Sequence, residues 1–230
     1  MSKQKEILQR GDEKLEAVEE VLSKTERFIE QNQKVITIIV GALIVVILGY
    51  FGLNKYYFQP REREAQNQIF PAQKYFEQDS LNLALFGHGD NPGFIEIASH
   101  YGSTKAGNLA KYYAGLSFLK QGNYQEAINY LKKFNGKDQI IAPLAIGAMA
   151  DAYVELNDFS QASSLYLKAA SKSKNEFTRP YLLFKAGRAF ELSKNYKKAL
   201  EAYETIKKEF PNTTEGRTID KYIEKAKGKV

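Results

Sequence analysis

The sequence contains no cysteine and no tryptophan, and its only histidines are His88 and His100. The absence of cysteine excludes disulfide bonds, thiolate nucleophiles and zinc sites built on cysteine. The two histidines lie 12 residues apart, one in a glycine-rich segment and one at the end of a predicted helix, so they do not indicate a shared metal ion. Hydrophobic residues make up 43% and charged residues 26% of the 230 residues, which excludes a wholly disordered chain.

Positive charge exceeds negative charge by a modest amount. The formal net charge is +6, from 33 Lys and Arg against 27 Asp and Glu. After residue 54 the balance is 26 basic against 19 acidic residues. Because this surplus is spread out and includes no arginine-rich stripe, we expect no nucleic-acid partner. It favours acidic protein surfaces or anionic lipid headgroups instead.

One segment is long and apolar enough to cross a membrane. Residues 35–54 read VITIIVGALIVVILGYFGLN and contain no charged side chain over 20 residues. A helix of this length rises ~30 Å, which matches the hydrocarbon core of a lipid bilayer. A cleaved signal peptide would have a shorter apolar region and small residues at its cleavage site, so we predict a retained transmembrane helix. Gly41, Gly49 and Gly52 fall near one helical face, where a neighbouring helix could dock.

The charges that flank this span predict its orientation only in part. Three Lys or Arg residues lie close to the span on each side. The amino-terminal arm, residues 1–34, holds seven Lys and Arg residues, and short basic arms tend to stay in the cytoplasm. We therefore expect a cytoplasmic N-terminus. The arm reads as a polar helix, either solvated or docking a partner, with an incomplete heptad seam of Leu8, Leu15, Leu22 and Ile29.

Three segments after the span repeat one pattern. Each has a small residue, an aromatic residue three positions later, an Asn or Asp beside another aromatic, and an alanine 12 positions after the small residue. The small residues pair as Gly115 with Ala127, Ala150 with Ala162, and Gly187 with Ala199. The steps between units, 35 and then 37 residues, are typical of helix pairs that stack into a solenoid. These residues resemble the tetratricopeptide repeat (TPR), with Leu183 in place of the consensus Trp in the third unit.

The predicted fold class is therefore all-α, with one transmembrane helix followed by a TPR α-solenoid. An amphipathic helix at 61–79 and a short helix at 93–101 read as a degenerate leading repeat. A polar helix at 215–228, burying Ile219, Tyr222 and Ile223, is expected to cap the other end. The expected divisions are a cytoplasmic arm at 1–34, the transmembrane helix at 35–54, leading helices and a loop at 55–104, three repeats at 105–214 and the capping helix at 215–230.

The layout of an arm, one span and a TPR domain resembles the YfgM-like ancillary subunits of the bacterial SecYEG translocon. Three stretches carry the resemblance, namely TERFIEQNQKV, IEIASHYGSTKAGNLAKYYAGLSFLKQGNYQEAINYLKKF and ALEAYETIKKEFPNTTEGRTIDKYIEKAK. The resemblance covers essentially the whole chain, with a longer arm and an insertion at 80–93. It implies a bacterial inner-membrane protein with a periplasmic repeat domain. The implied partners are the SecYEG/YidC translocon and a membrane-anchored, PpiD-like prolyl isomerase chaperone.

No arrangement of residues indicates catalysis. The glycine cluster at 87–93 lacks the preceding strand and the Gly-Lys-Ser/Thr ending of a phosphate-binding loop. Within it, only Asp90 and Asn91 offer side-chain oxygens to a calcium ion. We therefore expect a plain loop there, and a protein that is not an enzyme and uses no cofactor or metal.

The concave face of the solenoid is the predicted recognition surface, because the first helix of each pair lines it. The helical register places on this face Tyr112, Leu116 and Leu119 from the first unit, Asp151 and Val154 from the second, and Tyr181, Phe184 and Arg188 from the third. TPR domains that clamp a terminal carboxylate carry Lys and Asn where Tyr112 and Leu116 stand, so we expect no such clamp. An apolar, aromatic groove favours a helix or an extended nonpolar segment. In the alternative reading, some of these side chains pack against the helix at 61–79.

Two functions are consistent with these features. The first is a membrane-anchored periplasmic TPR adaptor, an accessory of the Sec translocon that links it to periplasmic chaperones. The second is a scaffold for envelope assembly or cell division that makes no contact with the translocon. The two hypotheses differ in which proteins the span and the groove contact.

Overall fold

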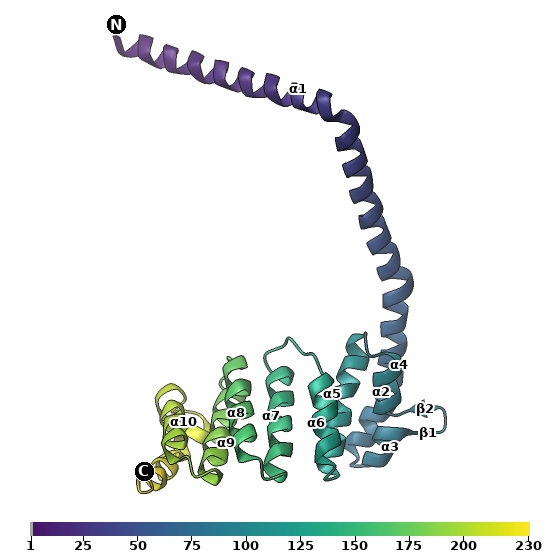
Figure 1. The fold of residues 1–230 in the computed structure, drawn as a ribbon, viewed down its shortest axis with the longest axis vertical. Coiled ribbons are helices and arrows are strands. Elements are labelled where there is room, and N and C mark those ends of the chain that lie inside the picture. Colours follow the sequence, from purple (N-terminus) through teal and green to yellow (C-terminus); the bar gives the residue numbers. More distant parts are fainter. Residues whose placement is uncertain (1) are drawn as a thin grey trace. The chain divides into compact units, whose positions relative to one another are not determined.

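The structure, a computed structural model, describes the backbone of residues 2–230 and the side chains of residues 26 and 28–230. The chain forms two compact units, Met1–Gln59 and Pro60–Val230. Both are helical, and the described strands are two short ones that pair with each other. The predicted all-α class is thereby confirmed (Figure 1).

The first unit is one long helix. Helix α1 spans Ser2–Leu53 and continues into a wider π-helical turn, Asn54–Phe58. Most of its apolar side chains from Phe28 to Leu53 are exposed, and no part of its most apolar stretch is buried against other described residues. One helix is thus long and apolar enough to span a membrane, as in a single-pass membrane protein. The predicted heptad positions Leu8, Leu15 and Leu22 lie outside the residues whose side chains are described.

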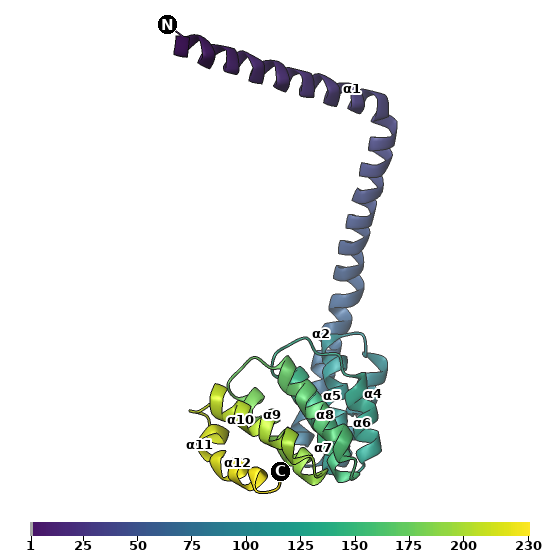
Figure 2. The same cartoon turned by 60° about the vertical axis from the view of Figure 1, so that its left-hand side comes forward.

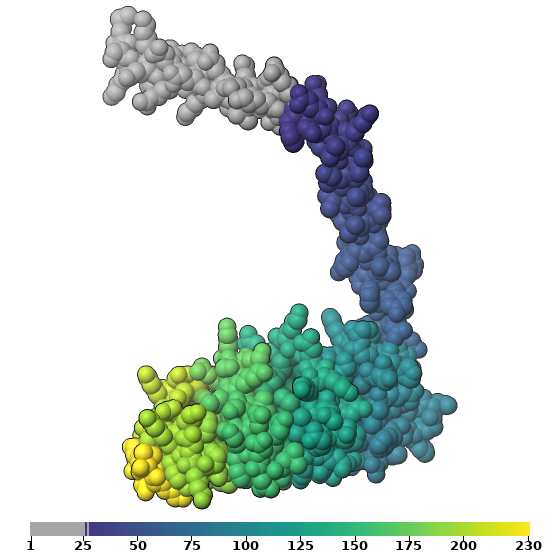
Figure 3. All heavy atoms as spheres, viewed as in Figure 1, coloured from purple at the N-terminus to yellow at the C-terminus, as the bar shows by residue number. Residues whose placement is uncertain are grey.

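The second unit contains three antiparallel helix pairs in a row (Figures 1 and 2). The pairs are α5 (Lys105–Lys120) with α6 (Tyr124–Lys133), α7 (Ile141–Glu155) with α8 (Phe159–Lys172), and α9 (Thr178–Leu192) with α10 (Tyr196–Glu209). In the space-filling view they form one continuous body from teal to yellow (Figure 3). The predicted helical repeat region is therefore present.

The turn inside each pair has the same backbone geometry. Gly122, Asn157 and Lys194 adopt positive φ angles of 78°, 61° and 60°. In each turn the next residue donates its N–H to a carbonyl five residues earlier, as Asn123 does to Phe118 at 2.9 Å. A left-handed residue with this bond closes a helix end and reverses the chain. Asp158 and Asn195 then cap the following helix through their side chains.

The small residues allow the two helices of a pair to approach closely. A Cβ atom on Gly115 would lie 2.5 Å from Cγ of Leu131 on α6. In the third pair, a Cβ on Gly187 would overlap the ring of the buried Tyr203 on α10. The glycines are thus required by the large side chains 16 positions later, which occupy the space that a Cβ would need.

The leading pair differs from the prediction in its second helix. Helix α2 (Gln59–Glu77) turns at Asp79, at φ 57°, into α3 (Leu81–Phe86). Ala72 and Ala84, both fully buried, repeat the 12-residue spacing of the other pairs. The segment 80–93, predicted as an insertion with a plain loop, therefore begins with the partner helix of α2. It then forms a hairpin of β1 (Gly87–His88) and β2 (Asn91–Pro92), followed by α4 (Phe94–His100).

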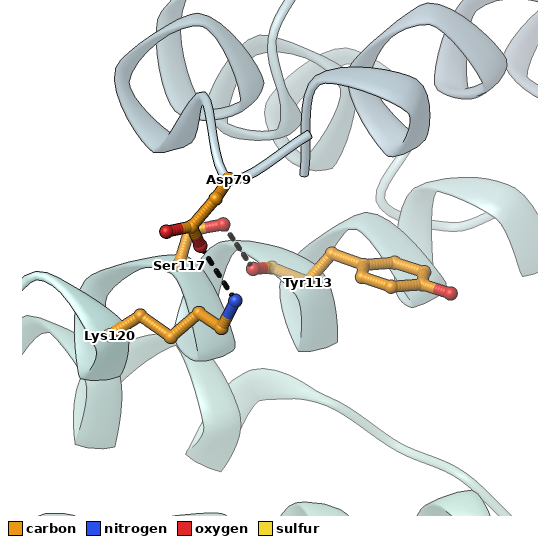
Figure 4. Close-up of polar contacts among 4 residues, drawn as sticks. All are labelled: Asp79, Tyr113, Ser117 and Lys120. Carbon is orange, nitrogen blue, oxygen red and sulfur yellow. Dashed lines mark hydrogen bonds and ion pairs between the residues drawn. The ribbon is translucent and has the colours of Figure 1, made fainter. Parts of the chain in front are cut away.

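Polar contacts join this leading pair to α5. At the turn end, the Lys120 ammonium lies 2.8 Å from the Asp79 carboxylate, and nearby the Ser117 hydroxyl donates to the Tyr113 carbonyl (Figure 4). At the opposite end, the Glu62 carboxylate accepts hydrogen bonds from the backbone N–H groups of Lys105 and Ala106. The leading pair is thus bonded to both ends of the first repeat.

The carboxyl-terminal cap consists of two helices where one was predicted. Helices α11 (Thr214–Thr218) and α12 (Asp220–Lys227) are separated at Ile219 (Figure 2). The Ile219 carbonyl accepts from the N–H groups of both Tyr222 and Ile223. Ile219 and Ile223 are both buried against the third repeat. The break at Ile219 lets the short segment bury these two side chains while keeping its polar face in solvent.

Candidate functional site: the groove between the first helices

A groove lies between the first helices of the three repeats. Its lining residues are Tyr112 and Leu116 from α5, Leu144, Gly147, Ala148 and Asp151 from α7, and Tyr181, Leu182 and Lys185 from α9. The hollow at its centre has a volume of about 160 Å³. A cavity of about 150 Å³ holds benzene in another protein, so this hollow has room for one large apolar side chain.

One wall of the groove is aromatic and fixed by packing. The Tyr112 ring lies 5.5 Å from the ring of Phe134 and 5.6 Å from that of Tyr113, between centroids. Burial raises the pKa of the Tyr112 hydroxyl, and Tyr113 and Asp138 raise it further. The ring therefore presents a neutral, mainly apolar surface to the hollow.

A glycine on α7 shapes the opposite wall. Gly147 occupies the place in the second unit that Tyr112 occupies in the first, 35 residues earlier. A Cβ atom on Gly147 would lie 2.7 Å from Cδ2 of Leu182. Because Gly147 has no side chain, α9 can approach α7 closely, and Leu182 of α9 closes the bottom of the hollow.

A partly buried ion pair at the edge of the groove forms its polar part. The Lys185 Nζ atom on α9 lies 2.6 Å from Oδ1 of Asp151 on α7, and both side chains are about one-third exposed, at 29% and 32%. The Tyr166 hydroxyl, from α8, donates to the same carboxylate oxygen. The Lys185 ammonium also lies 5.1 Å from the centroid of the Tyr181 ring. Three helices therefore meet at Asp151.

These contacts fix the protonation states of the cluster. Burial acts to lower the pKa of Lys185, but the adjacent Asp151 carboxylate outweighs it and raises that pKa above its ordinary value. Burial also raises the pKa of Tyr166, and the negative charge of Asp151 raises it further. At neutral pH the groove thus contains a neutral tyrosine, an ammonium and a carboxylate, with the two charges compensating each other.

Four of the eight predicted groove residues line this hollow, namely Tyr112, Leu116, Asp151 and Tyr181. Phe184 instead packs against Tyr222 of α12, with ring centroids 4.8 Å apart. Arg188 pairs with Glu191 at 3.5 Å and stacks over the Tyr222 ring. Both residues therefore contact the capping helix, and Phe184 is partly buried there, whereas the Arg188 side chain stays 46% exposed. Leu119 and Val154 pack against the hydrophobic core.

Sequence reasoning missed the partners of Asp151. It named neither Tyr166 nor Lys185 among the groove residues. A signal was present, because Lys185 follows Tyr181 by four residues and so shares its helical face. A carboxylate placed on an otherwise apolar face also needs a cation or a hydrogen-bond donor beside it.

The histidines and the span glycines lie outside this site. His88 is in β1, and the exposed His100 ends α4. Among the side chains that the structure describes, no three acidic or histidine groups come close enough to hold a metal ion. Gly41, Gly49 and Gly52 lie on α1, and an added Cβ would meet no atom within 4 Å at any of them. A docking role for these glycines stays a prediction.

Comparison with known proteins identifies the repeats. A family model described as the tetratricopeptide repeat matches residues 109–137 and 181–213. These segments contain most of the α5–α6 and α9–α10 pairs, which are the first and third repeats. No curated protein matches the chain. The groove therefore lies on the first helices of a repeat region in which tetratricopeptide repeats are detected.

Proposed function

We propose that this protein is a membrane-anchored adaptor that binds a segment of a protein partner in the groove between α5, α7 and α9. The single observation that carries the proposal is the groove itself, an apolar hollow with one ion pair at its edge. Tetratricopeptide repeats typically bind protein partners through this face. The apolar helix α1 supplies the anchor.

The lining indicates what the partner segment presents. Tyr112, Leu116 and Leu144 surround a space for one large apolar side chain, which would anchor the segment by burial. The Asp151 and Lys185 pair and the Tyr181 hydroxyl lie beside that space and offer hydrogen bonds to a peptide backbone. An extended segment with a Leu or aromatic anchor fits this arrangement better than an acidic one, because the single ammonium is already paired.

Anchoring compensates for a small groove. Tethering two proteins to one membrane raises their effective concentration, so that a weak site can remain occupied. We propose that the partners are the SecYEG/YidC translocon and a PpiD-like prolyl isomerase chaperone, with the repeats in the periplasm. The arrangement of arm, span and repeats, similar to that of YfgM-like subunits, supports this assignment. In it, residues 1–34 are the cytoplasmic arm and residues 35–54 are the span.

Site-specific crosslinking in intact membranes tests this proposal. Photoreactive residues are placed at Gly41, Gly49 and Tyr112, one at a time, in the full chain. Leu43 is the control for the span, because two residues along a helix place it about 200° from Gly41. The full chain is then extracted in detergent, and its crosslinked partners are identified by mass spectrometry.

The two candidate functions give different results. Recovery of SecY or YidC from positions 41 and 49, and of a chaperone or a translocating chain from position 112, supports the translocon adaptor. Recovery only of cell-division or outer-membrane assembly proteins contradicts it and favours the scaffold. Equal crosslinking at Leu43 and Gly41 would show that the glycine face is not a docking face.

A further inference from the structure

One edge of the repeat domain is formed by the loops that lead into the first helices. These loops are residues 101–104, 134–140 and 173–177, and we call this side the loop edge (Figure 1). The start of α2 lies on it, because Glu62 bonds to the start of α5 and Arg61 donates to the His100 carbonyl at the end of α4. The loops are also bonded into the domain, Asn175 to the Gln139 carbonyl at 3.0 Å and Asn108 to Asn135.

Two large apolar side chains stand exposed on this edge, at positions where a helix usually has a polar cap. The N-cap residues of α5 and α11 are Thr104 and Thr213, whose hydroxyls accept from the helix backbone. At the N-caps of α7 and α9 stand Ile140 and Phe177, which are 57% and 89% exposed. Polar residues are strongly preferred at this position. The fold itself therefore does not require apolar side chains there.

The capping bonds in these two loops come from residues two positions earlier. The Asp138 carboxylate accepts from the N–H of Ile140, and the Asn175 amide oxygen accepts from the N–H groups of Phe177 and Thr178. The same device thus holds both apolar residues at the tips of neighbouring loops.

A basic hollow lies between the first two loops of this edge. Lys105, Lys111, Lys133 and Lys137 line it together with Gly102, Ser103, Thr104, Asn108 and Asn135, and its volume is about 630 Å³. No acidic side chain lines it, and none of the four lysines forms an ion pair with a described residue. The Lys111 ammonium donates to the Gly102 carbonyl at 2.8 Å, and burial together with the nearby Lys133 lowers the pKa of Lys111. Along the edge, Lys172 and Lys174 flank the Phe177 loop, together with Glu176.

Chain connectivity keeps the start of α2, at one end of this edge, close to the apolar run of α1. Pro60, the first residue of the repeat unit, follows Asn54, the last residue of the apolar run, by six residues. Six residues reach at most ~20 Å even when fully extended. The opposite edge, at the carboxyl ends of the first helices, lies a further helix length away, which for the 15 residues of α9 is ~22 Å.

We propose that the loop edge docks on the anionic lipid headgroups of the bilayer that α1 spans, with Ile140 and Phe177 entering the interface and the basic hollow receiving lipid phosphate. Stable peripheral contact generally needs both an apolar insertion and a basic patch, and the loop edge has both. The inference rests on the membrane anchoring in the proposed function but not on any protein partner. Docking would hold the groove at a fixed height above the membrane.

The absence of tryptophan makes a direct test possible. Phe177→Trp introduces a single Trp into the full chain, and Leu192→Trp, at the other end of α9, is the matched control. Each variant is incorporated into nanodiscs of phosphatidylcholine alone or with phosphatidylglycerol. Quenching of Trp fluorescence by brominated lipid chains then reports insertion. A third variant, F177W with Lys133→Glu and Lys137→Glu, removes part of the basic hollow.

We expect severalfold stronger quenching of F177W than of L192W in nanodiscs with phosphatidylglycerol. In nanodiscs of phosphatidylcholine alone, the quenching of F177W should be weaker. The ratio of docked to undocked protein should fall by at least about fivefold for each Lys→Glu change, because each removes one positive charge and adds a negative one. Equal quenching of F177W and L192W in both membranes overturns the proposal. So does quenching of F177W that is insensitive to phosphatidylglycerol and to the lysine changes. Incorporation into nanodiscs itself requires the span. Equal quenching would therefore overturn the docking of the loop edge on lipid without contradicting the membrane anchor or the groove of the proposed function.

Discussion

Lys185 on α9 and Asp151 on α7 form an ion pair, 2.6 Å between Nζ and Oδ1, at the edge of the groove. The pair joins the second repeat to the third and is also the polar feature that a bound segment would meet. Tyr166 of α8 donates to the same carboxylate, so the stability of the repeat stack and the chemistry of the groove depend on one side chain.

Removal of Asp151 should destabilise the repeat domain. In Asp151→Ala, the Lys185 ammonium and the Tyr166 hydroxyl lose their shared partner, and we expect a loss of about 2 kcal/mol in the free energy of unfolding. In the double variant Asp151→Leu with Lys185→Met, the loss should be smaller, because no unpaired charge remains. Denaturant unfolding of the full chain in detergent measures both.

The matched control is the Asp79 and Lys120 pair, which has a similar distance of 2.8 Å but lies on the exposed surface. Asp79→Asn should leave the stability nearly unchanged, since exposed pairs contribute little and Asn tolerates the left-handed backbone at this turn. Equal losses for Asp79→Asn and Asp151→Ala would contradict the central position that we give to Asp151.

The stability of the domain should fall at alkaline pH through this cluster. The folded state raises the pKa of both Lys185 and Tyr166 above their ordinary values of 10.5 and 10.0. Their stabilising contribution is therefore complete below those values and is lost as the pH rises through the folded-state pKa values. Above about pH 10, Tyr166→Phe should reduce the slope of stability against pH by up to about 1.4 kcal/mol per unit. Parallel curves for the parent protein and Tyr166→Phe would contradict the assignment.

Gly187→Ala should destabilise the third repeat. The added methyl group overlaps the buried Tyr203 ring, and such overpacking costs about 2 kcal/mol. Gly228→Ala is the control, because its nearest atoms would lie at an ordinary 3.7 Å, and it should change the stability by less than about 0.5 kcal/mol. The midpoint temperatures of thermal unfolding of the two variants measure this difference. Equal midpoint temperatures would show that Gly187 and Tyr203 are not in close contact.

The orientation of the span can be measured with single cysteines, because the chain has none of its own. In intact spheroplasts, a membrane-impermeant maleimide should label Lys197→Cys in the repeat domain. It should label Ser23→Cys in the arm only after the membrane is permeabilised. The reverse pattern would place the repeats in the cytoplasm and contradict the periplasmic adaptor.

The repeat pattern predicted the fold well because it depends on local spacing. A small residue and an alanine 12 positions apart specify the crossing of two helices, and the pattern located all three clear pairs. The leading pair has the same spacing at Ala72 and Ala84. Its second helix was missed because the hairpin at Gly87–Pro92 lengthens the step to the next unit from 35 to 43 residues, from Ala84 to Ala127.

The groove could be predicted less completely, because its composition depends on contacts between repeats. Helical register placed Tyr112, Leu116, Asp151 and Tyr181 on one face, and these four residues line one hollow. The same register placed Phe184 and Arg188 there too, but in the last unit both contact Tyr222 of α12 and neither lines the hollow. Whether a position at the end of a solenoid is open or covered depends on how the capping helices pack, which the repeat pattern does not specify.

The most direct test of the adaptor is crosslinking from two positions of equal exposure in intact membranes. Tyr181 lines the groove and is 39% exposed, whereas Leu167 on α8, the second helix of its pair, does not line it and is 38% exposed. A photoreactive residue at Tyr181 should capture one defined partner, and capture should disappear when Leu116→Arg places a charge among the apolar lining. A photoreactive residue at Leu167 should capture no defined partner. Equal capture from both positions, or capture from Tyr181 that survives Leu116→Arg, would contradict binding in the groove.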